Sequence, residues 1–199
     1  MSIGIIGTGN IGSAIARAMV RIGQDVTLAN SRGAASLEAL VYELGAKAKA
    51  GTVAEAAKAD IVFVSVNWSK IPSALSGLGD WGGRIVVDTN NPIEAPTFRP
   101  FDLGGRSSSE VFAEFVPGAK VVKAFNHLQP HLLSGNPRAE GGQRVLFLAG
   151  DDGASKGKVA QLMTKLGFHA IDLGSLAEGG RLTQFPGGPL PALNLVKFG

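Results

Sequence analysis

Short apolar runs alternate along the chain with segments in which hydrophobic residues recur every three or four positions. The runs 61–64 and 85–87 are continuously apolar and rich in β-branched residues, which is typical of strands buried on both faces of a parallel sheet. By contrast, Ile11, Ile15 and Met19 recur at four-residue steps, which predicts a helix. Because this alternation continues through most of the chain, we expect an α/β fold with a doubly wound, mostly parallel sheet and helices on both faces.

The same pattern gives approximate bounds for each element. We expect strands near residues 2–7, 25–30, 46–50, 60–66, 84–88, 119–124, 145–149 and 168–172. We expect helices near residues 11–22, 34–44, 52–58, 69–78, 107–115 and 153–166. Glycines at 23, 45 and 167 follow three of these helices, as C-terminal caps do. The serines before Glu110 are suited to an N-terminal cap.

Length and loop composition indicate one main domain with a small addition. The chain has 199 residues, enough for a single α/β domain. We expect residues 1–173 to form that domain, and residues 174–199 to form a small C-terminal segment, rich in glycine and proline, that contributes to an acceptor site or a dimer contact. Residues 91–106 also contain several prolines and glycines, so they predict a long loop and a candidate lid.

The first strand runs directly into a glycine-rich turn, Gly7-Thr8-Gly9-Asn10-Ile11-Gly12, and a helix follows. In this context Gly7 allows the tight turn, Gly9 lets the backbone approach a pyrophosphate, and Gly12 lets the helix pack against the strand. The helix N-terminus offers free N–H groups and a positive dipole end to phosphates. The pattern predicts a dinucleotide site; the alternative is a glycine-rich corner that binds no ligand.

The end of the second strand indicates which dinucleotide binds. NAD sites usually carry Asp or Glu about 20 residues past the glycine loop, where it binds the ribose 2′-hydroxyl, but this chain has Asn30-Ser31-Arg32 there. A hydroxyl and a guanidinium suit a 2′-phosphate, so we expect NADP(H), with Ser36 as a further contact. The alternative is that Asn30 and Ser31 cap the next helix and Arg32 is a solvated charge.

Composition limits the kinds of binding partner that we expect. The formal net charge is only +3, and there is no run of Lys or Arg, so we expect no nucleic-acid partner; a modest positive balance suits small phosphate-bearing molecules. The chain has no cysteine, which excludes disulfides, thiolate zinc sites and cysteine nucleophiles. We find no basic leader and no apolar run of about 20 residues, so we expect a cytoplasmic protein without a membrane partner.

Few side chains suggest acid–base or metal chemistry. Lys123 near a strand end is either a proton carrier or, as we prefer, a solvated or structural residue. His127 and His131 are four residues apart, but Pro130 lies between them and no third ligand is near, so we expect no metal site. His127 alone is a candidate polar contact for a hydride acceptor. We therefore assign no catalytic side chain.

The remaining candidates each have a functional and a packing interpretation. Trp68 and Trp81 would shield a cofactor or simply pack in the core. His169 falls within the last predicted strand and is expected to be structural. Arg181 would bind an anionic acceptor or pair with Glu178.

Three stretches together resemble the NADP oxidoreductases of the coenzyme F420-dependent type, whose nucleotide domain also occurs in the six-transmembrane metalloreductases. They are the loop 7–12, Asn30-Ser31-Arg32-Gly33, and Val121-Val122-Lys123-Ala124-Phe125-Asn126. The likeness covers residues 2–173 and, more loosely, residues 181–182 and 187–190. It implies a Rossmann domain with a small C-terminal piece, often a homodimer, that passes a hydride between NADP(H) and a deazaflavin such as coenzyme F420 or a flavin such as FMN or FAD.

The resemblance also implies roles for individual residues. The stretch Thr8 to Ile11 would hold the pyrophosphate, and Ser31 with Arg32 the 2′-phosphate. The loops after two later strands would lie along the cofactor, which points to Val66, Asn67, Trp68, Asn90 and Asn91. The stretch from Ala124 to His127 would line the nicotinamide, with Asn126 and His127 nearest to the acceptor. Arg181 and Pro189 lie in the loosely matched tail and are candidate acceptor contacts.

The sequence therefore favours an NADPH-dependent oxidoreductase with a flavin-like or deazaflavin acceptor. Hydride transfer between two stacked rings needs alignment more than acid–base groups, which fits the shortage of such groups. Two alternatives remain open: a reductase of a small carbonyl or imine, and a non-catalytic NADPH-binding sensor.

Overall fold

The computed structural model of the protein describes residues 1–94 and 96–199. The strands are β1 (Ser2–Ile6), β2 (Asp25–Ala29), β3 (Ala48–Ala50), β4 (Ile61–Val64), β5 (Ile85–Asp88), β6 (Ile93–Glu94), β7 (Arg99–Pro100), β8 (Lys120–Ala124), β9 (Arg138–Ala139), β10 (Gly142–Gly150), β11 (His169–Asp172) and β12 (Val196–Lys197). The α-helices are α1 (Asn10–Arg21), α2 (Glu38–Leu44), α3 (Val53–Ala56), α4 (Ile71–Leu75), α5 (Ser108–Ala113), α6 (Pro130–Ser134), α7 (Gly153–Leu166) and α8 (Gly179–Thr183). Short 3-10 helices are η1 (Ala34–Leu37), η2 (Gly45–Lys47) and η3 (Trp68–Lys70).

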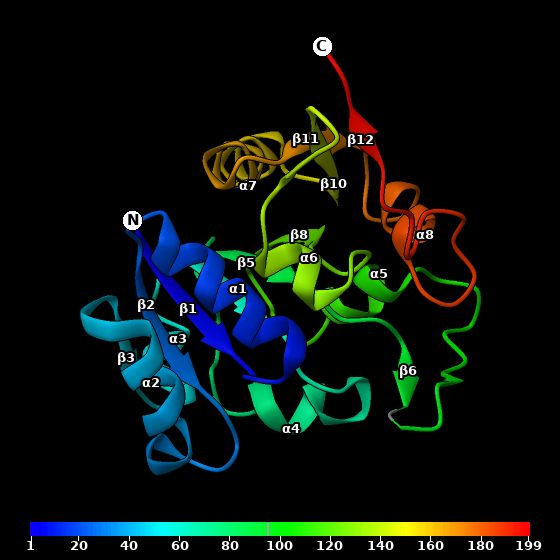
Figure 1. Ribbon diagram of the computed structural model, residues 1–199. Coiled ribbons are helices and arrows are strands. Elements are labelled where there is room, and N and C mark those ends of the chain that lie inside the picture. Colours follow the sequence, from blue (N-terminus) through cyan, green and yellow to red (C-terminus); the bar gives the residue numbers. More distant parts are fainter. Residues whose placement is uncertain (95) are drawn as a thin grey trace.

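Ten of these strands form the main sheet, eight of them in the order β11-β10-β8-β5-β4-β1-β2-β3, while β9 and β12 pair with β10. β6 and β7 form a separate two-stranded sheet. The chain builds outward from β1 to β2 and β3, then returns to place β4 on the other side of β1, where it pairs in parallel. β5 and β8 continue the parallel sheet. This reversal of strand order at β1 is the doubly wound Rossmann arrangement that the sequence predicts, and Figure 1 shows β1 beside β2, with β5 and β8 on its other side.

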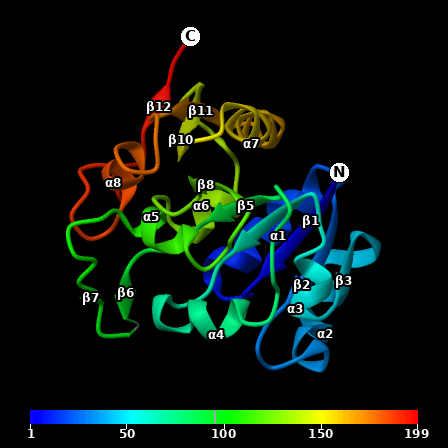
Figure 2. The same cartoon turned by 180° about the vertical axis from the view of Figure 1, so that it is seen from behind.

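The two faces of the sheet bury separate hydrophobic cores. Ile3, Ile5 and Phe63 point to one face, where they pack with residues of α1 and α7. Ile6, Val62 and Val64 point to the other face, where they pack with residues from α3, α4 and α5. Alternate strand residues therefore supply opposite cores. Figure 1 looks onto the side that carries α1 and α6, and Figure 2 onto the side that carries α3.

The last two long strands run against the others. β10 pairs antiparallel with β8, whereas β11 is parallel to β10. The connection between β8 and β10 contains only α6 and the two-residue strand β9, so the chain turns back instead of crossing over the sheet. The alternating pattern of the sequence predicts these strands but not their direction.

Several short elements are absent from the sequence-based prediction. Within residues 91–106, the two-residue strands β6 and β7 pair antiparallel. The segment 174–199 contains α8 and β12, of which β12 pairs with β10. The predicted cap at α5 is confirmed: Ser107 and Glu110 form a reciprocal capping box. None of the helices in the described part of the chain has the length and hydrophobicity of a membrane-spanning segment.

Candidate functional site

The glycine loop between β1 and α1 has the geometry of a phosphate-binding turn. Gly7 has a φ of 96°, and a Cβ atom there would lie 2.0 Å from the Ser65 carbonyl oxygen. A Cβ at Gly12 would lie 1.9 Å from the Gly7 carbonyl oxygen. Both positions therefore require glycine for packing alone. At Gly9, by contrast, no described atom lies within 4 Å of such a Cβ, so this glycine leaves room for a ligand.

The start of α1 is open to an anion. Gly9 is the N-cap residue, and within the described residues no side chain caps this helix and no acidic residue occupies its first turn. Asn10 and Ile11 begin the helix, so their backbone N–H groups precede the first intrahelical acceptors. The positive end of the helix dipole points the same way. These features fit a pyrophosphate.

The turn after β2 is organised by Asn30. Its Nδ2 donates to Thr8 Oγ1 (3.1 Å) and to Ser36 Oγ (3.0 Å), and its Oδ1 accepts from the backbone N–H of Arg32 (2.9 Å). Ser36 also donates to the Gly33 carbonyl oxygen. Because Asn30 and Ser36 are bonded to one another and to the turn, Ser31 and Arg32 are left exposed at its tip.

A cavity of about 680 Å³ joins these two loops to the loop after β4. It is lined by Ile6, Gly7, Thr8, Gly9, Asn30, Ser31, Arg32, Val53, Ser65, Val66, Asn67, Lys70, Ser73 and Ala74. Among these described lining residues none is acidic, and two carry positive charge, Arg32 and Lys70. Within residues 1–94 and 96–199, Arg32 forms no ion pair. The cavity therefore offers unpaired positive charge to a phosphate-bearing ligand.

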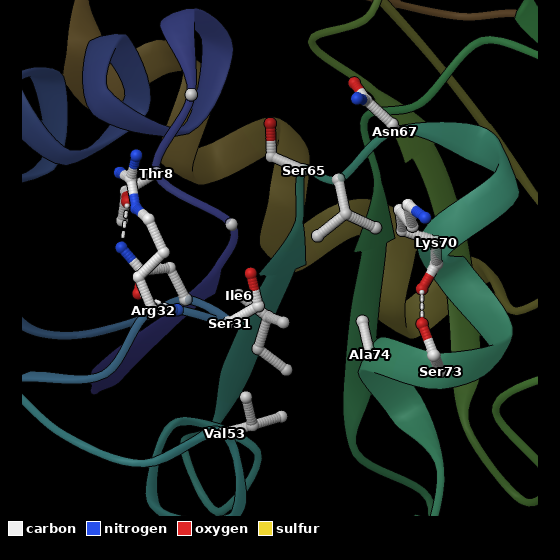
Figure 3. A pocket seen from close by; sticks show the side chains of 14 residues that line it. Ile6, Thr8, Ser31, Arg32, Val53, Ser65, Asn67, Lys70, Ser73 and Ala74 are labelled. Atoms are coloured by element: carbon white, nitrogen blue, oxygen red, sulfur yellow. Dashed lines mark hydrogen bonds between the residues drawn. The ribbon is translucent and has the colours of Figure 1, made fainter. Parts of the chain in front are cut away.

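Sequence reasoning missed one wall of this cavity. Figure 3 shows Arg32 and Thr8 on one side and Lys70, Ser73 and Ala74 on the other, with Ser65 between them. Lys70 and Ser73 lie at the junction of η3 and α4, where Ser73 Oγ donates to the Lys70 carbonyl oxygen (3.0 Å). The two residues are three positions apart and follow a buried strand. This spacing, which puts them on one face of a helix, is the only local feature of the sequence that points to them.

The residues implied after β4 and β5 divide into exposed and buried ones. Val66 and Asn67 line the cavity, whereas Trp68 is buried in the core on the α3 side of the sheet. Asn90 is also buried: its Oδ1 accepts from the Val66 backbone N–H (2.9 Å), and its Nδ2 donates to Asp88 Oδ1 (2.9 Å). The side-chain amide of Asn90 is therefore occupied within the protein.

Lys123 is buried, so of the two preferred interpretations, solvated or structural, the solvated one is wrong. Its ammonium lies 3.0 Å from Asp88 Oδ2, and the side chains of both residues are 0% exposed. The two residues are register partners on the parallel strands β5 and β8, which places two opposite charges together inside the sheet. Burial lowers the pKa of Lys123, and the carboxylate of Asp88 acts in the opposite direction.

The chain turns sharply where β8 ends. Ala124 is fully buried, and Phe125 has a φ of 62°, a left-handed conformation that costs a bulky residue about 1–3 kcal/mol. The Phe125 ring packs edge-on against Phe63, with ring centroids 5.4 Å apart. This turn brings the Asn126 amide to Asn91 (3.1 Å) and to the Thr183 carbonyl oxygen (2.7 Å).

Asn91 connects this end of the site to the C-terminal segment. Its Nδ2 donates to the Asn126 carbonyl oxygen (3.0 Å), and its Oδ1 accepts from the backbone N–H of Phe185 (3.0 Å). Asn126 Oδ1 is buried and has no hydrogen-bond partner among residues 1–94 and 96–199. The residues implied for the nicotinamide end are thus brought together, in contact with the tail.

His127 follows Asn126 and is almost fully buried, with its ring 4.9 Å from that of Phe147. Burial lowers its pKa from 6.5 to about 4, and the backbone of Val145 opposes this shift only in part. The imidazole is therefore neutral at physiological pH. The backbone carbonyl of His127 accepts from Ala192 in the tail (2.8 Å).

The two tail candidates lie at the surface. Arg181 in α8 donates to the Gly105 carbonyl oxygen (2.7 Å) and lies 4.0 Å from Glu110. The acidic neighbour is thus Glu110 of α5, and the proposed pairing with Glu178 is wrong. Pro189 is exposed in the loop between α8 and β12.

Comparisons with known proteins point to one family. Residues 2–92 match the family described as NADP oxidoreductase, coenzyme F420-dependent. A hypothetical protein from Sinorhizobium meliloti is 46% identical and superimposes with a TM-score of 0.92, over 99% of this chain and 96% of that one. A candidate F420-dependent NADP-reductase from Arthrobacter sp. FB24 is 30% identical with a TM-score of 0.76, over 88% of this chain and 86% of that one.

Metalloreductases contain a similar segment. The metalloreductase STEAP3 of Rattus norvegicus is 28% identical over 96% of this chain. The present chain spans only 37% of that protein, so the likeness concerns one part of a longer enzyme.

Proposed function

The chain belongs to the coenzyme F420-dependent family of NADP oxidoreductases, and from this premise we propose that it transfers a hydride between NADP(H) and a flavin-like or deazaflavin acceptor. The observation that carries the proposal is the cavity in which the Gly9 turn and the Ser31–Arg32 tip face the same space without an acidic neighbour. The bound nicotinamide would supply the hydride. The protein would hold the pyrophosphate at the start of α1 and the 2′-phosphate at Ser31 and Arg32.

Cofactor choice is tested with Arg32→Ala. We expect NADPH affinity to fall about 10- to 100-fold, because charge-assisted hydrogen bonds to the 2′-phosphate contribute about 1.5–3 kcal/mol. NADH affinity should not change, since NADH lacks that phosphate. Arg138→Ala is the matched control, because Arg138 is an exposed arginine on β9, outside the cavity. Unchanged NADPH binding by Arg32→Ala, measured by isothermal titration calorimetry, would reject the assignment.

Two observations support a ring acceptor over a substrate that requires a placed proton donor. Lys123 is enclosed and bonded to Asp88, and His127 is neutral and buried. Transfer between stacked rings depends on alignment and needs neither group. Coenzyme F420, FMN and FAD are the acceptor classes that we propose.

A panel of acceptors separates the proposal from its alternatives. NADPH oxidation is followed with F420, FMN, FAD, a quinone, a ketone and a cyclic imine. Rapid turnover of one of the flavin-like acceptors is the expected result. Turnover of the ketone or imine alone, lost in His127→Leu, would instead indicate a carbonyl or imine reductase. Tight NADPH binding without any turnover would indicate a sensor.

We also propose that the protein is a cytoplasmic homodimer in which residues 174–199 contribute to the acceptor site. The support for the second part is that Thr183 and Phe185 are hydrogen-bonded to Asn126 and Asn91. Sedimentation equilibrium tests the dimer against the chain mass of 20.5 kDa. Phe185→Ala keeps the backbone bond to Asn91 and removes only the exposed ring beside the site, so it should raise the KM of the acceptor and leave NADPH affinity unchanged.

A further inference from the structure

The proposed function makes no use of the buried ion pair between Asp88 and Lys123. Asp88 is the last residue of β5, and Lys123 is the last but one of β8. Both side chains are fully enclosed, and taking two charges out of water is costly unless every polar atom is satisfied. The hydrogen-bond partners of the ion pair therefore indicate which segments the pair holds in place.

Every hydrogen-bonding site of the pair is occupied from within the protein. The Lys123 ammonium donates to Asp88 Oδ2 (3.0 Å), to the Asn90 carbonyl oxygen and to Ser108 Oγ (3.5 Å). Asp88 Oδ2 also accepts from Ser109 Oγ (3.0 Å). An ammonium has three donors, and all three are engaged here. We call Asp88, Asn90, Ser108, Ser109 and Lys123 the ion-pair network.

The network reaches the cavity through Asn90. Asp88 Oδ1 accepts from both the backbone N–H and the Nδ2 of Asn90 (2.9 Å each). Asn90 Oδ1 in turn accepts from the backbone N–H of Val66 (2.9 Å), and Val66 lines the cavity. Three strand ends, those of β4, β5 and β8, are thus tied together by one buried pair.

These three ends lie on one side of the point where the strand order reverses. β2, which leads into Arg32, lies on the other side of β1. A dinucleotide lies across such a reversal, with its two halves over opposite sides. The adenosine half would therefore lie over the β2 side, and the nicotinamide half over the ends of β4, β5 and β8.

We propose that the Asp88–Lys123 pair positions the nicotinamide half of the cofactor, by fixing the loops after β4 and β5 against the end of β8 through Asn90. The inference rests on the proposed binding of NADP(H). Asp88 and Lys123 are positioning residues that do not touch the cofactor themselves. Apolar residues of similar size would fill the same space but would give Asn90 nothing to bond.

The double variant Asp88→Leu/Lys123→Met tests this without leaving a buried charge unpaired. Removing both partners of a buried pair is often tolerated, so we expect the double variant to fold. Calorimetry with 2′,5′-ADP measures the affinity for the adenosine half alone, and titration with NADPH measures the affinity for the whole cofactor. The fluorescence of the bound dihydronicotinamide ring reports how firmly that half is held.

We expect 2′,5′-ADP affinity to stay within about twofold of the wild type, while NADPH affinity falls about tenfold, the loss for one pre-arranged polar contact. The fluorescence enhancement of bound NADPH should be lost. Asn90→Ala, which cuts the network beyond the pair, should have the same effect. Adding Asn90→Ala to the double variant should not lower NADPH affinity any further, because the three residues act as one unit.

Lys156→Met is the matched control. Lys156 pairs with Asp172 at 2.9 Å between α7 and β11, at the far edge of the sheet. Its loss should change neither ligand affinity nor NADPH fluorescence, whatever it does to stability.

The outcomes separate this inference from the proposed function. A wild-type protein that binds neither NADPH nor 2′,5′-ADP rejects the proposed function and, with it, the inference. The inference alone is rejected if the wild type binds both ligands and the variants keep its ratio of NADPH to 2′,5′-ADP affinity and its NADPH fluorescence. A parallel loss of 2′,5′-ADP and NADPH affinity also rejects it, since the effect is then on the whole domain. If the double variant does not fold, Asn90→Ala decides by the same two measurements.

Discussion

On the β2 side of the candidate site, the polar side chains are exposed or half-buried, and most of their partners are close in the chain. Asn30 bonds to Arg32 and Ser36, two and six residues away, and to Thr8 on the neighbouring strand end. On the β8 side, Lys123, Asp88 and Asn126 are buried and have distant partners: Lys123 bonds to Asp88 across 35 residues, and Asn126 to Thr183 across 57. One half of the site is a local turn, whereas the other is held by tertiary structure.

This difference has a physical consequence for how each half responds to change. Exposed groups are stabilised by water as well as by the protein, so altering them affects ligand binding with little effect on folding. Buried groups have only the protein, so losing one partner leaves the other unsatisfied. We therefore expect mutations to separate binding from stability on the β2 side and to couple them on the β8 side.

The largest expected effect is that of Asp88→Leu alone. It leaves the Lys123 ammonium buried without its carboxylate, which should lower the free energy of unfolding by about 3–5 kcal/mol. Arg32→Ala, on the exposed side, should change it by less than about 0.5 kcal/mol. Urea denaturation measures both. Equal midpoints for the two variants would contradict the comparison.

Acidification should destabilise the β8 side through His127. Its folded pKa of about 4 lies below the ordinary value of 6.5, so between these values the unfolded chain binds more protons than the folded one. The free energy of unfolding should therefore fall as the pH falls from about 6.5 to about 4, by at most about 3 kcal/mol, and this term should change no further below that. His127→Leu should remove this part of the pH dependence.

His131→Leu is the control for that experiment, because His131 is exposed on α6. Denaturation curves at several pH values give the comparison. A His127 variant with the same slope as the wild type between pH 6.5 and 4 would show that burial of this ring is not the cause.

On the β2 side, Gly9→Ala should affect binding and not folding. The added Cβ meets no described atom within 4 Å, and the φ of −72° suits alanine. It would instead occupy the space of the pyrophosphate, so NADPH and NADH affinity should both fall about tenfold or more. Gly153→Ala, at the start of α7, is equally open and should leave affinity unchanged. Tight binding by Gly9→Ala would place the pyrophosphate elsewhere.

The same contrast explains how much could be predicted from the sequence. The loop 7–12 and the turn 30–32 are short motifs whose bonds lie within a few residues or join neighbouring strand ends, so their geometry follows from local spacing. The main strands and helices also follow from hydrophobic period. The direction of β10 does not, because it depends on how the chain turns after β8.

The β8 side was only partly predictable, for a physical reason. Lys123 carries a charge that usually remains solvated, and its burial makes sense only once Asp88 is known to be its register partner on β5. Likewise, no residue close to Asn126 in the sequence indicates that its side-chain amide donates to the Thr183 carbonyl oxygen. Such pairs can be predicted only when the order of the strands and the path of the C-terminal segment are known.

The smallest effect concerns Lys70, which sharpens the comparison because it lies across the cavity from Arg32 on the exposed side. An exposed lysine is a point charge without the two-pronged fork of Arg32 and contributes about 0.2–1 kcal/mol to an ion pair, so Lys70→Ala should weaken NADPH binding by less than about fivefold. The loss should shrink as salt is raised, because screening weakens exposed charges. Lys165→Ala, on α7 and outside the cavity, should show neither effect. A loss for Lys70→Ala as large as that for Arg32→Ala would mean that both walls hold the same phosphate, and that the β2 side is not the local turn described above.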